Sequence, residues 1–89
     1  MREPYLEVTF RHGRPLAAYL YLPRKAEEKS YKTRELAPGL LVDYARGGTP
    51  IGIEITDPDH VTLSRLNEVL KKLGQPKLKR ADLAPLRAA

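Results

Sequence analysis

Two carboxylates near the centre of the chain, Asp43 and Glu54, are the residues best suited to chemistry. They belong to two runs rich in Ile, Leu, Val and Tyr, residues 40–45 and 51–56, which flank a turn containing a Gly-Gly pair. Two such runs around a Gly-Gly turn predict a β-hairpin. We therefore expect the two acids to project from neighbouring antiparallel strands.

The alternation of side chains along a strand decides which hairpin residues share a face. With the two strands paired across the turn, Asp43 faces Gly52 and Leu41 faces Glu54, so the two acids are diagonal neighbours. The Cβ atoms of diagonal neighbours lie about 7–8 Å apart or less. This spacing fits a carboxylate acid/base pair or a site for a hard metal ion.

These residues also have a purely structural interpretation. Asp43 and Glu54 could form ion pairs with Lys32 or Arg34 on an adjoining strand. Gly52 lacks a side chain, so a neighbouring tyrosine or another subunit could lie against its strand. We expect the structural interpretation to hold, and therefore predict no catalytic residue, no metal site and no cofactor.

Histidines and cysteines are the other common metal ligands and catalytic groups. The chain has no cysteine, which excludes disulfides and thiolate zinc sites. His12 lies in a predicted turn, and His60 lies just before a predicted helix. Their separation matches no usual ligand spacing. We expect both histidines to be solvent-exposed turn residues.

The elements that position these groups follow from the prolines and from the apolar periodicity. A period of two predicts strands at residues 5–10, 17–22, 30–36, 40–45 and 51–56. The polar composition of the third strand suggests an edge position. The sequence thus predicts an α+β fold, an antiparallel β-meander of about five strands followed by an amphipathic α-helix and a short C-terminal segment. Residues 1–89 are expected to form a single domain, with the sheet in residues 5–56.

A helix is predicted over residues 62–74, where the apolar period changes to about 3.6. Thr62 is a suitable N-cap for this helix. The basic tail, residues 75–89, follows it. Leu83 and Leu86 could anchor a short second helix in the tail.

The positive charge of the chain is concentrated at its C-terminal end. Residues 1–61 contain nine Lys or Arg and nine Asp or Glu, so the whole net charge of +5 belongs to residues 62–89. A basic segment can bind an anionic partner such as nucleic acid, but a solvated helix face has the same composition. The candidate anion-binding residues are Lys71, Lys72, Lys77, Lys79 and Arg80.

The hairpin and the strand before it resemble a known family. Residues 39–44 (Gly-Leu-Leu-Val-Asp-Tyr), the Gly-Ile-Glu of residues 52–54 and the Tyr-Leu-Tyr-Leu of residues 19–22 resemble the YuzE-like family of small bacterial proteins. This family is a domain of unknown function, and the resemblance covers roughly residues 5–56. It implies no established catalytic mechanism. Because some members are thought to lie beside toxin genes, it implies an antitoxin-like role.

One face of the predicted sheet gathers the candidate functional or interface residues. They are Leu41, Asp43, Gly52, Glu54, Tyr19 and Tyr21. Since its tyrosines and leucine are too apolar to be left in water, we expect this face to form an interface. The small size of the domain also favours support from another subunit. We therefore expect a homodimer or larger homo-oligomer.

Three functions remain open at this stage. The leading hypothesis is a non-enzymatic interaction module, acting as a homo-oligomer that binds a protein partner. The alternatives are a nucleic-acid-binding protein that uses the basic C-terminal segment, and a carboxylate-dependent enzyme or metal-binding protein at Asp43 and Glu54. No apolar run has the length of a membrane span, and the first residues do not resemble a signal peptide. We therefore expect a cytoplasmic location and no membrane partner.

Overall fold

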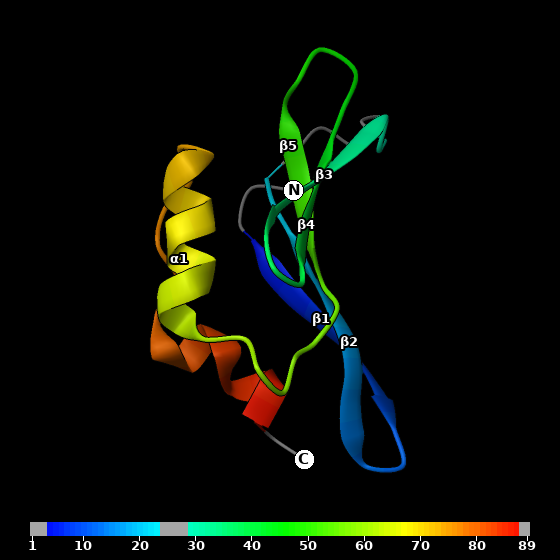
Figure 1. Cartoon of the computed structure of the whole chain (residues 1–89). Helices are drawn as coiled ribbons and strands as arrows, with labels where there is room; N and C mark the ends of the chain where they lie inside the picture. Colours follow the sequence, from blue (N-terminus) through cyan, green and yellow to red (C-terminus); the bar gives the residue numbers. More distant parts are fainter. Residues whose placement is uncertain (1–3, 24–28, 88–89) are drawn as a thin grey trace.

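The computed structural model describes residues 4–23 and 29–87, which form one antiparallel sheet and two helical segments (Figure 1). The elements in chain order are β1 (Tyr5–Arg11), β2 (Arg14–Tyr21), β3 (Lys32–Ala37), β4 (Leu40–Tyr44), β5 (Pro50–Ile55), α1 (Leu63–Lys72) and the 3₁₀ helix η1 (Arg80–Arg87). The predicted α+β class, with five antiparallel strands followed by a helix, is confirmed.

The order of the strands in the sheet is β1-β2-β5-β4-β3. A continuous meander would place β3 beside β2, so this part of the prediction is wrong. Instead, β2 pairs with β5, and β3 lies at the far edge, as its polar composition predicted. The physical reason is burial. Strand β5 contains Ile51, Ile53 and Ile55, all fully buried, and a central position covers such a strand on both edges.

The register of the β4–β5 hairpin agrees with the sequence-based expectation. Asp43 lies opposite Gly52, and Leu41 lies opposite Glu54. An irregularity after Asp43 places Tyr44 opposite Pro50. The predicted face of the hairpin is therefore correct at the positions of both acids.

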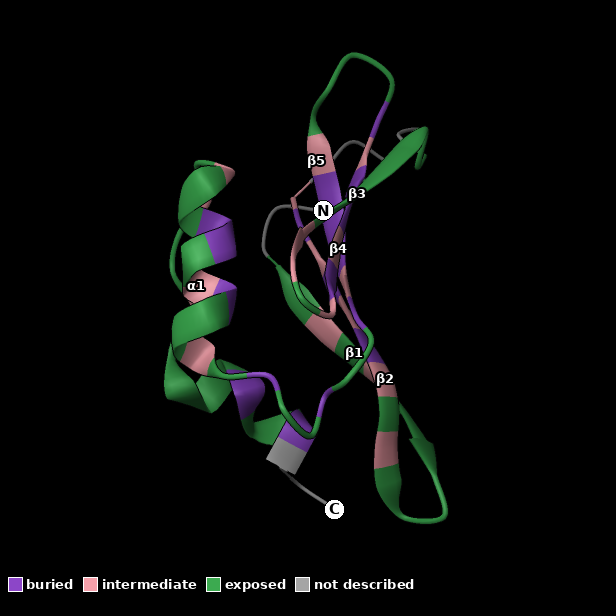
Figure 2. Ribbon diagram, viewed as in Figure 1, coloured by how far each residue is buried: buried purple, intermediate pink, exposed green. Residues whose placement is uncertain are grey.

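The hydrophobic core lies between the sheet and the two helical segments. Figure 2 shows the buried side of α1 turned towards the strands. From α1 the buried residues are Leu66, Val69 and Leu70, which confirms the predicted apolar stripe. The 3₁₀ helix contributes Leu83 and Leu86, both buried as expected. The inner face of the sheet contributes Ala18, Leu20, Leu22, Leu40, Val42, Ile53 and Ile55.

Side-chain and backbone caps define both ends of α1. The Thr62 hydroxyl accepts a hydrogen bond from the Arg65 backbone N–H (3.1 Å), so the predicted N-cap is confirmed. At the other end, Gly74 has a φ of 71°, and the N–H of Gln75 donates to the Leu70 carbonyl (2.9 Å). This is a Schellman ending, in which glycine avoids the steric cost of a left-handed conformation. No helix among the described residues has the length and apolar content needed to cross a membrane.

The segment after α1 is held against the rest of the domain. The side chain of Asn67 in α1 donates to the Leu78 carbonyl (3.1 Å) and accepts from the Leu78 N–H (2.8 Å). Farther along, η1 contacts β1. The part of the predicted basic tail that the structure describes is therefore folded onto the sheet. No local sequence pattern marks Asn67 as the residue that fastens this segment.

Candidate functional site on the outer face of the sheet

The side of the sheet turned away from α1 presents two rows of side chains that cross all five strands. One row consists of Tyr5, Tyr21, Gly52, Asp43 and Thr33, and the other consists of Glu7, Tyr19, Glu54, Leu41 and Glu35. We call these ten residues the outer face. It contains all six candidate residues proposed from the sequence. The structure therefore brings these candidates together on one surface.

Asp43 is the buried centre of the outer face, with only 6% of its surface exposed. The Tyr19 hydroxyl donates to Asp43 Oδ2 (2.8 Å), and the Thr33 hydroxyl donates to Asp43 Oδ1 (2.5 Å). Each carboxylate oxygen thus accepts one hydrogen bond from a hydroxyl group. These bonds offset the cost of burying a carboxylate, which is high when the group is left unpaired.

Gly52 makes the bond from Tyr19 to Asp43 geometrically possible. Tyr19 lies on β2 and Asp43 lies on β4, so the tyrosine must reach over β5, which separates them. A Cβ atom on Gly52 would overlap the Tyr19 ring. The expectation that a tyrosine lies against this glycine is therefore confirmed.

The expected ion pairs with Lys32 and Arg34 are replaced by hydroxyl contacts. Thr33 is the β3 residue opposite Asp43. Because side chains alternate along a strand, the neighbouring Lys32 and Arg34 project from the opposite side of the sheet. The predicted ion pairs are wrong because the pattern indicates that β3 adjoins the hairpin but does not show which β3 residue lies opposite Asp43.

The second acid, Glu54, lies diagonally across the β4–β5 pair from Asp43. Partial burial raises the pKa of Glu54 above its usual 4.5, and hydrogen bonding to Asp43 and repulsion by its charge raise it further. Two nearby carboxylates favour a form in which one holds a proton. The diagonal pair expected from the sequence is therefore present, and Glu54 is the member that takes up a proton more readily than usual.

Three tyrosine rings pack together beside the acids. Tyr5 stacks on Tyr21 with ring centroids 4.5 Å apart, and Tyr19 meets Tyr21 edge-on at 4.7 Å. The Tyr21 hydroxyl also donates to Glu7 Oε1 (3.2 Å). Tyr5 and Glu7 were not among the predicted site residues. The alternation within β1 is the signal that predicts them, since it places Tyr5 and Glu7 on the same side of the strand.

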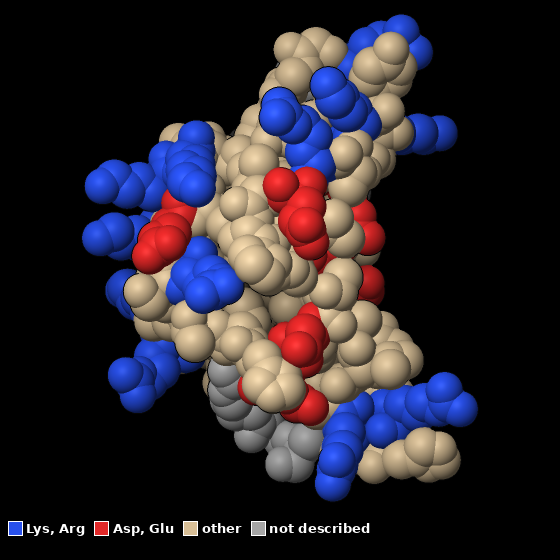
Figure 3. Space-filling view, viewed as in Figure 1, with Lys and Arg blue, Asp and Glu red and all other residues tan. Residues whose placement is uncertain are grey.

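The outer face is acidic, which corrects the expectation of an apolar surface. Its two rows contain four carboxylates and three phenolic hydroxyls and no Lys or Arg. In Figure 3, which views the sheet from its edge, most of the charged side chains over α1 on the left are Lys and Arg, and acidic side chains lie over the sheet and along its right-hand side. Further basic side chains lie at the two ends of the sheet.

The candidate anion-binding residues lie away from the outer face. All five are exposed and belong to the end of α1 and the segment after it. Lys71 and Lys72 occupy the last turn of α1, where positive charge interacts favourably with the helix dipole. The structure therefore separates the basic residues from the carboxylate pair. The predicted residues are Lys71, Lys72, Lys77, Lys79 and Arg80.

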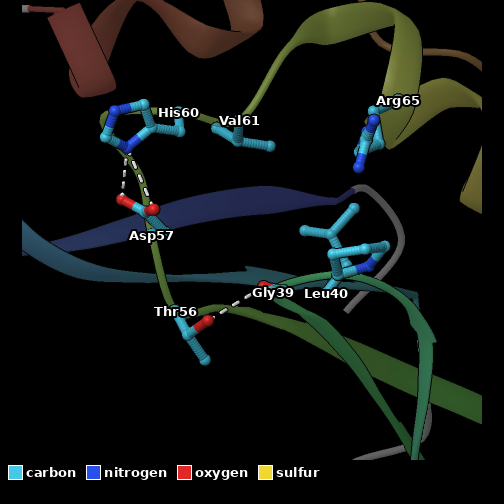
Figure 4. Close-up of a pocket in the computed structure, with 8 residues that line it drawn as sticks. Gly39, Leu40, Thr56, Asp57, His60, Val61 and Arg65 are labelled. Carbon is cyan, nitrogen blue, oxygen red and sulfur yellow. Dashed lines mark hydrogen bonds and ion pairs between the residues drawn. The ribbon is translucent and has the colours of Figure 1, made fainter.

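The two histidines are exposed turn residues, as expected. His12 lies in the β1–β2 turn with a φ of 53°. His60 Nδ1 lies 2.9 Å from Asp57 Oδ2, and this hydrogen bond together with the charge of Asp57 raises the pKa of His60. Asp57 and His60 border a pocket of about 340 Å³ that Arg65 also lines. Figure 4 shows the Asp57–His60 pair at one side of this pocket and Arg65 at the other.

The arrangement of the carboxylate pair is that of an organised surface. Neither Asp43 nor Glu54 lines the pocket beside His60 and Arg65, the pocket beside Tyr31, or the pocket between β1 and η1. Within the same part of the chain, no group of three or more His, Asp or Glu residues is arranged to hold a metal ion. Asp43 uses both oxygens to fix its neighbours. Glu7 and Glu35 are exposed, whereas Glu54 is partly buried beside Asp43.

Comparison with known proteins gives one family match. No curated protein and no solved structure matches the chain. The family match runs from β2 to just beyond β5, so it includes Tyr19, Thr33, Asp43, Gly52 and Glu54 but leaves out β1, α1 and η1. Residues 17–57 match the family described as a protein of unknown function, DUF2283, which indicates a small uncharacterised domain.

Proposed function

We propose that the chain is a non-enzymatic interaction module whose outer face binds a Lys- or Arg-rich segment of a partner protein. The observation that supports this most directly is the composition of the outer face, with four carboxylates, three tyrosines and no basic residue in two continuous rows. Tyrosine is enriched at protein interfaces. Complementary charge selects the partner and speeds its association.

The internal contacts of the outer face support this proposal. Asp43 is held by two hydroxyls, and Tyr21 is held by ring contacts on two sides. Side chains that are already ordered lose little conformational freedom on binding, which lowers the entropic cost of association. The outer face therefore has the properties of a preorganised docking surface.

The proposed partner is a different protein rather than a second copy bound through the same face. A two-fold dimer uses the same patch on both subunits, and here it would set carboxylates against carboxylates. The homo-oligomer expected from the sequence therefore needs another surface. The projecting end of the β1–β2 hairpin offers one, since Phe10 and Leu16 are 46% and 52% exposed there.

An antitoxin-like role is the more specific form of the proposal. It rests on the resemblance to the YuzE-like family, whereas the family match itself indicates only a domain of unknown function. In this form, the partner is a basic protein encoded beside the gene for this chain. The acidic face would then cover a basic surface that the partner needs for its own activity.

The experiment is co-purification with the product of each neighbouring gene, followed by measurement of the Kd. Reversing two exposed outer-face charges, Glu7→Lys with Glu35→Lys, is expected to weaken the complex at least about tenfold, because like charges would then meet across the interface. The matched control, Asp59→Lys with Glu68→Lys, changes the net charge equally at exposed positions outside the outer face. It is expected to leave the Kd within about twofold.

Three outcomes would overturn the proposal. One is equal weakening by the two charge-reversed proteins. A second is a complex that forms with a neighbouring protein but protects only α1 from hydrogen exchange. The third is the absence of a complex with every neighbour, together with no change in the outer-face amide resonances on addition of an Arg-rich peptide.

A further inference from the structure

The end of the sheet opposite η1 holds a second surface, which has the opposite charge. A pocket of about 300 Å³ opens there between the start of β3 and the β4–β5 turn. Its lining residues are Tyr31, Lys32, Arg34, Tyr44, Ala45, Gly47 and Gly48. Among the residues that the structure describes, no carboxylate lines this pocket, and two of its lining residues are cations. This combination of aromatic and basic groups is independent of the outer face.

The aromatic part of the pocket is accessible. Tyr31 is 61% exposed, and the guanidinium carbon of Arg46 lies 4.3 Å from the centre of its ring. Tyr31 and Arg46 thus already form a stacked pair. Nucleobases stack on both tyrosine rings and guanidinium planes, so a base added to this pair extends an existing stack.

Two cations, Lys32 and Arg34, line the same pocket as Tyr31. Lys32 lies opposite Tyr44, and Arg34 lies opposite Val42. Both basic side chains therefore project from the inner side of the sheet, near its end, and both are exposed. Gly47 and Gly48 leave the turn side of the pocket open, since a Cβ at either position would meet nothing within 4 Å.

We propose that this pocket binds single-stranded nucleic acid, with a base stacked on Tyr31 and phosphates held by Lys32, Arg34 and Arg46. Tyr19 and Tyr21 project from the outer face, on the other side of the sheet from Lys32 and Arg34. A single strand is the form that exposes the π-faces of its bases. An acidic peptide would satisfy the cations but would add no base to the pair formed by Tyr31 and Arg46.

The surface beside the pocket is also positively charged, so a bound nucleic acid could continue along it. In Figure 1, the C-terminal end of α1 and the β4–β5 turn lie at the same end of the molecule. Figure 3 shows basic side chains over both. Lys71 and Lys72 belong to that end of α1. A nucleic acid that extends from the pocket towards α1 would therefore meet further positive charge.

The test measures binding of the full-length chain to a fluorescently labelled single-stranded RNA of about 12 nucleotides, a length within the usual range of site sizes. The salt concentration is varied between about 50 and 200 mM. Tyr31→Ala is expected to weaken binding about 5- to 100-fold, because base stacking is lost, and to leave the salt dependence unchanged. Tyr31→Phe is expected to retain the affinity.

The charge is tested with a matched pair of double substitutions. Lys32→Gln with Arg34→Gln is expected to reduce the slope of log K against log salt by about 1.4, since each phosphate contact of a single strand contributes about 0.7. Lys77→Gln with Lys79→Gln removes the same charge from the segment after α1, and is expected to change the slope by less than about 0.7. All four positions are exposed, so these proteins should fold normally, which circular dichroism verifies.

Several results would overturn this inference. They are an affinity for RNA that Tyr31→Ala does not change, equal losses in the two double variants, or no binding at the lowest salt concentration. Equal binding of duplex RNA, heparin or polyglutamate would also contradict it, because these probes offer charge without accessible bases.

Discussion

The two faces of the sheet are built from the same strands but are stabilised in different ways. The inner face is aliphatic and buried, with Val42 and Ile53 both at 0% exposure, so its stability comes from removing apolar surface from water. The outer face depends on directional contacts, in which the Tyr19 hydroxyl, reaching over Gly52, and the Thr33 hydroxyl both donate to the buried carboxylate of Asp43. The inner face should therefore respond to lost volume, and the outer face to small changes in geometry and charge.

The largest effect is expected from lost volume on the inner face. Ile53→Ala should lower the free energy of unfolding by about 2–5 kcal/mol, because it removes transfer energy and leaves a cavity. Urea denaturation measures this loss. Leu41→Ala, on the outer face and only half-buried, should cost clearly less. Equal losses at the two positions would contradict the distinction between the faces.

A single added carbon on the outer face should have the next largest effect. Gly52→Ala should cost about 1–3 kcal/mol, because its Cβ would overlap the Tyr19 ring. In a Tyr19→Ala background, the same change should be neutral or stabilising by up to about 1 kcal/mol, since alanine restricts the unfolded strand more than glycine does. A double-mutant cycle measured by denaturation checks the coupling. Identical costs in both backgrounds would show that the ring contact is unimportant.

The charge at the centre of the outer face is tested by Asp43→Asn. The amide NH₂ cannot accept a hydrogen bond, so either Tyr19 or Thr33 loses its acceptor, at a cost of about 1–2 kcal/mol. Removing the negative charge should also lower the pKa of Glu54 towards its usual value. An NMR titration of the Glu54 carboxyl measures this shift. An unchanged pKa would mean that the two acids are not coupled.

The smallest effect concerns the pH dependence contributed by Glu54. Because its pKa is raised in the folded state, the folded chain binds more protons than the unfolded chain, and stability falls as pH rises from 4.5 towards that raised value. Glu54→Gln should remove this fall and give a higher Tm than the parent at pH values above it.

Thermal denaturation between about pH 4 and pH 6 measures this difference. Within this range His60 stays largely protonated, because Asp57 raises its pKa above 6.5, so its own titration interferes little. Glu68→Gln, at an exposed position on α1, is the control. Parallel curves for the parent and Glu54→Gln would show that Glu54 does not titrate abnormally.

Local patterns predicted the elements and several of their details. The alternation in residues 40–56 was enough to place Asp43 opposite Gly52, because a short hairpin fixes its own register. The N-cap at Thr62 and the apolar stripe of α1 were also predicted, since both depend on residues within one or two helical turns. The capacity of Gly52 to accept a tyrosine followed from its missing side chain.

Contacts between distant segments could not be predicted in the same way. Periodicity shows which residues share a face of one strand, but it does not show which strands are neighbours. The sequence therefore indicated a meander, and it assigned Lys32 and Arg34 to the acids. Because β5 lies beside β2, Tyr19 reaches Asp43, although the two residues are 24 positions apart in the sequence.

The sequence alone determined an antiparallel sheet with a capped helix, an acidic pair on one hairpin face and a basic C-terminal end, because these depend on residue type and local period. The tertiary structure decided the rest. The strand order assembled Tyr5, Glu7 and Glu35 with the acidic pair into one surface, and the β3 register separated that surface from the basic pocket at Tyr31. The reason is that non-local strand pairing is chosen by burial of the whole apolar face, which no short stretch of sequence contains.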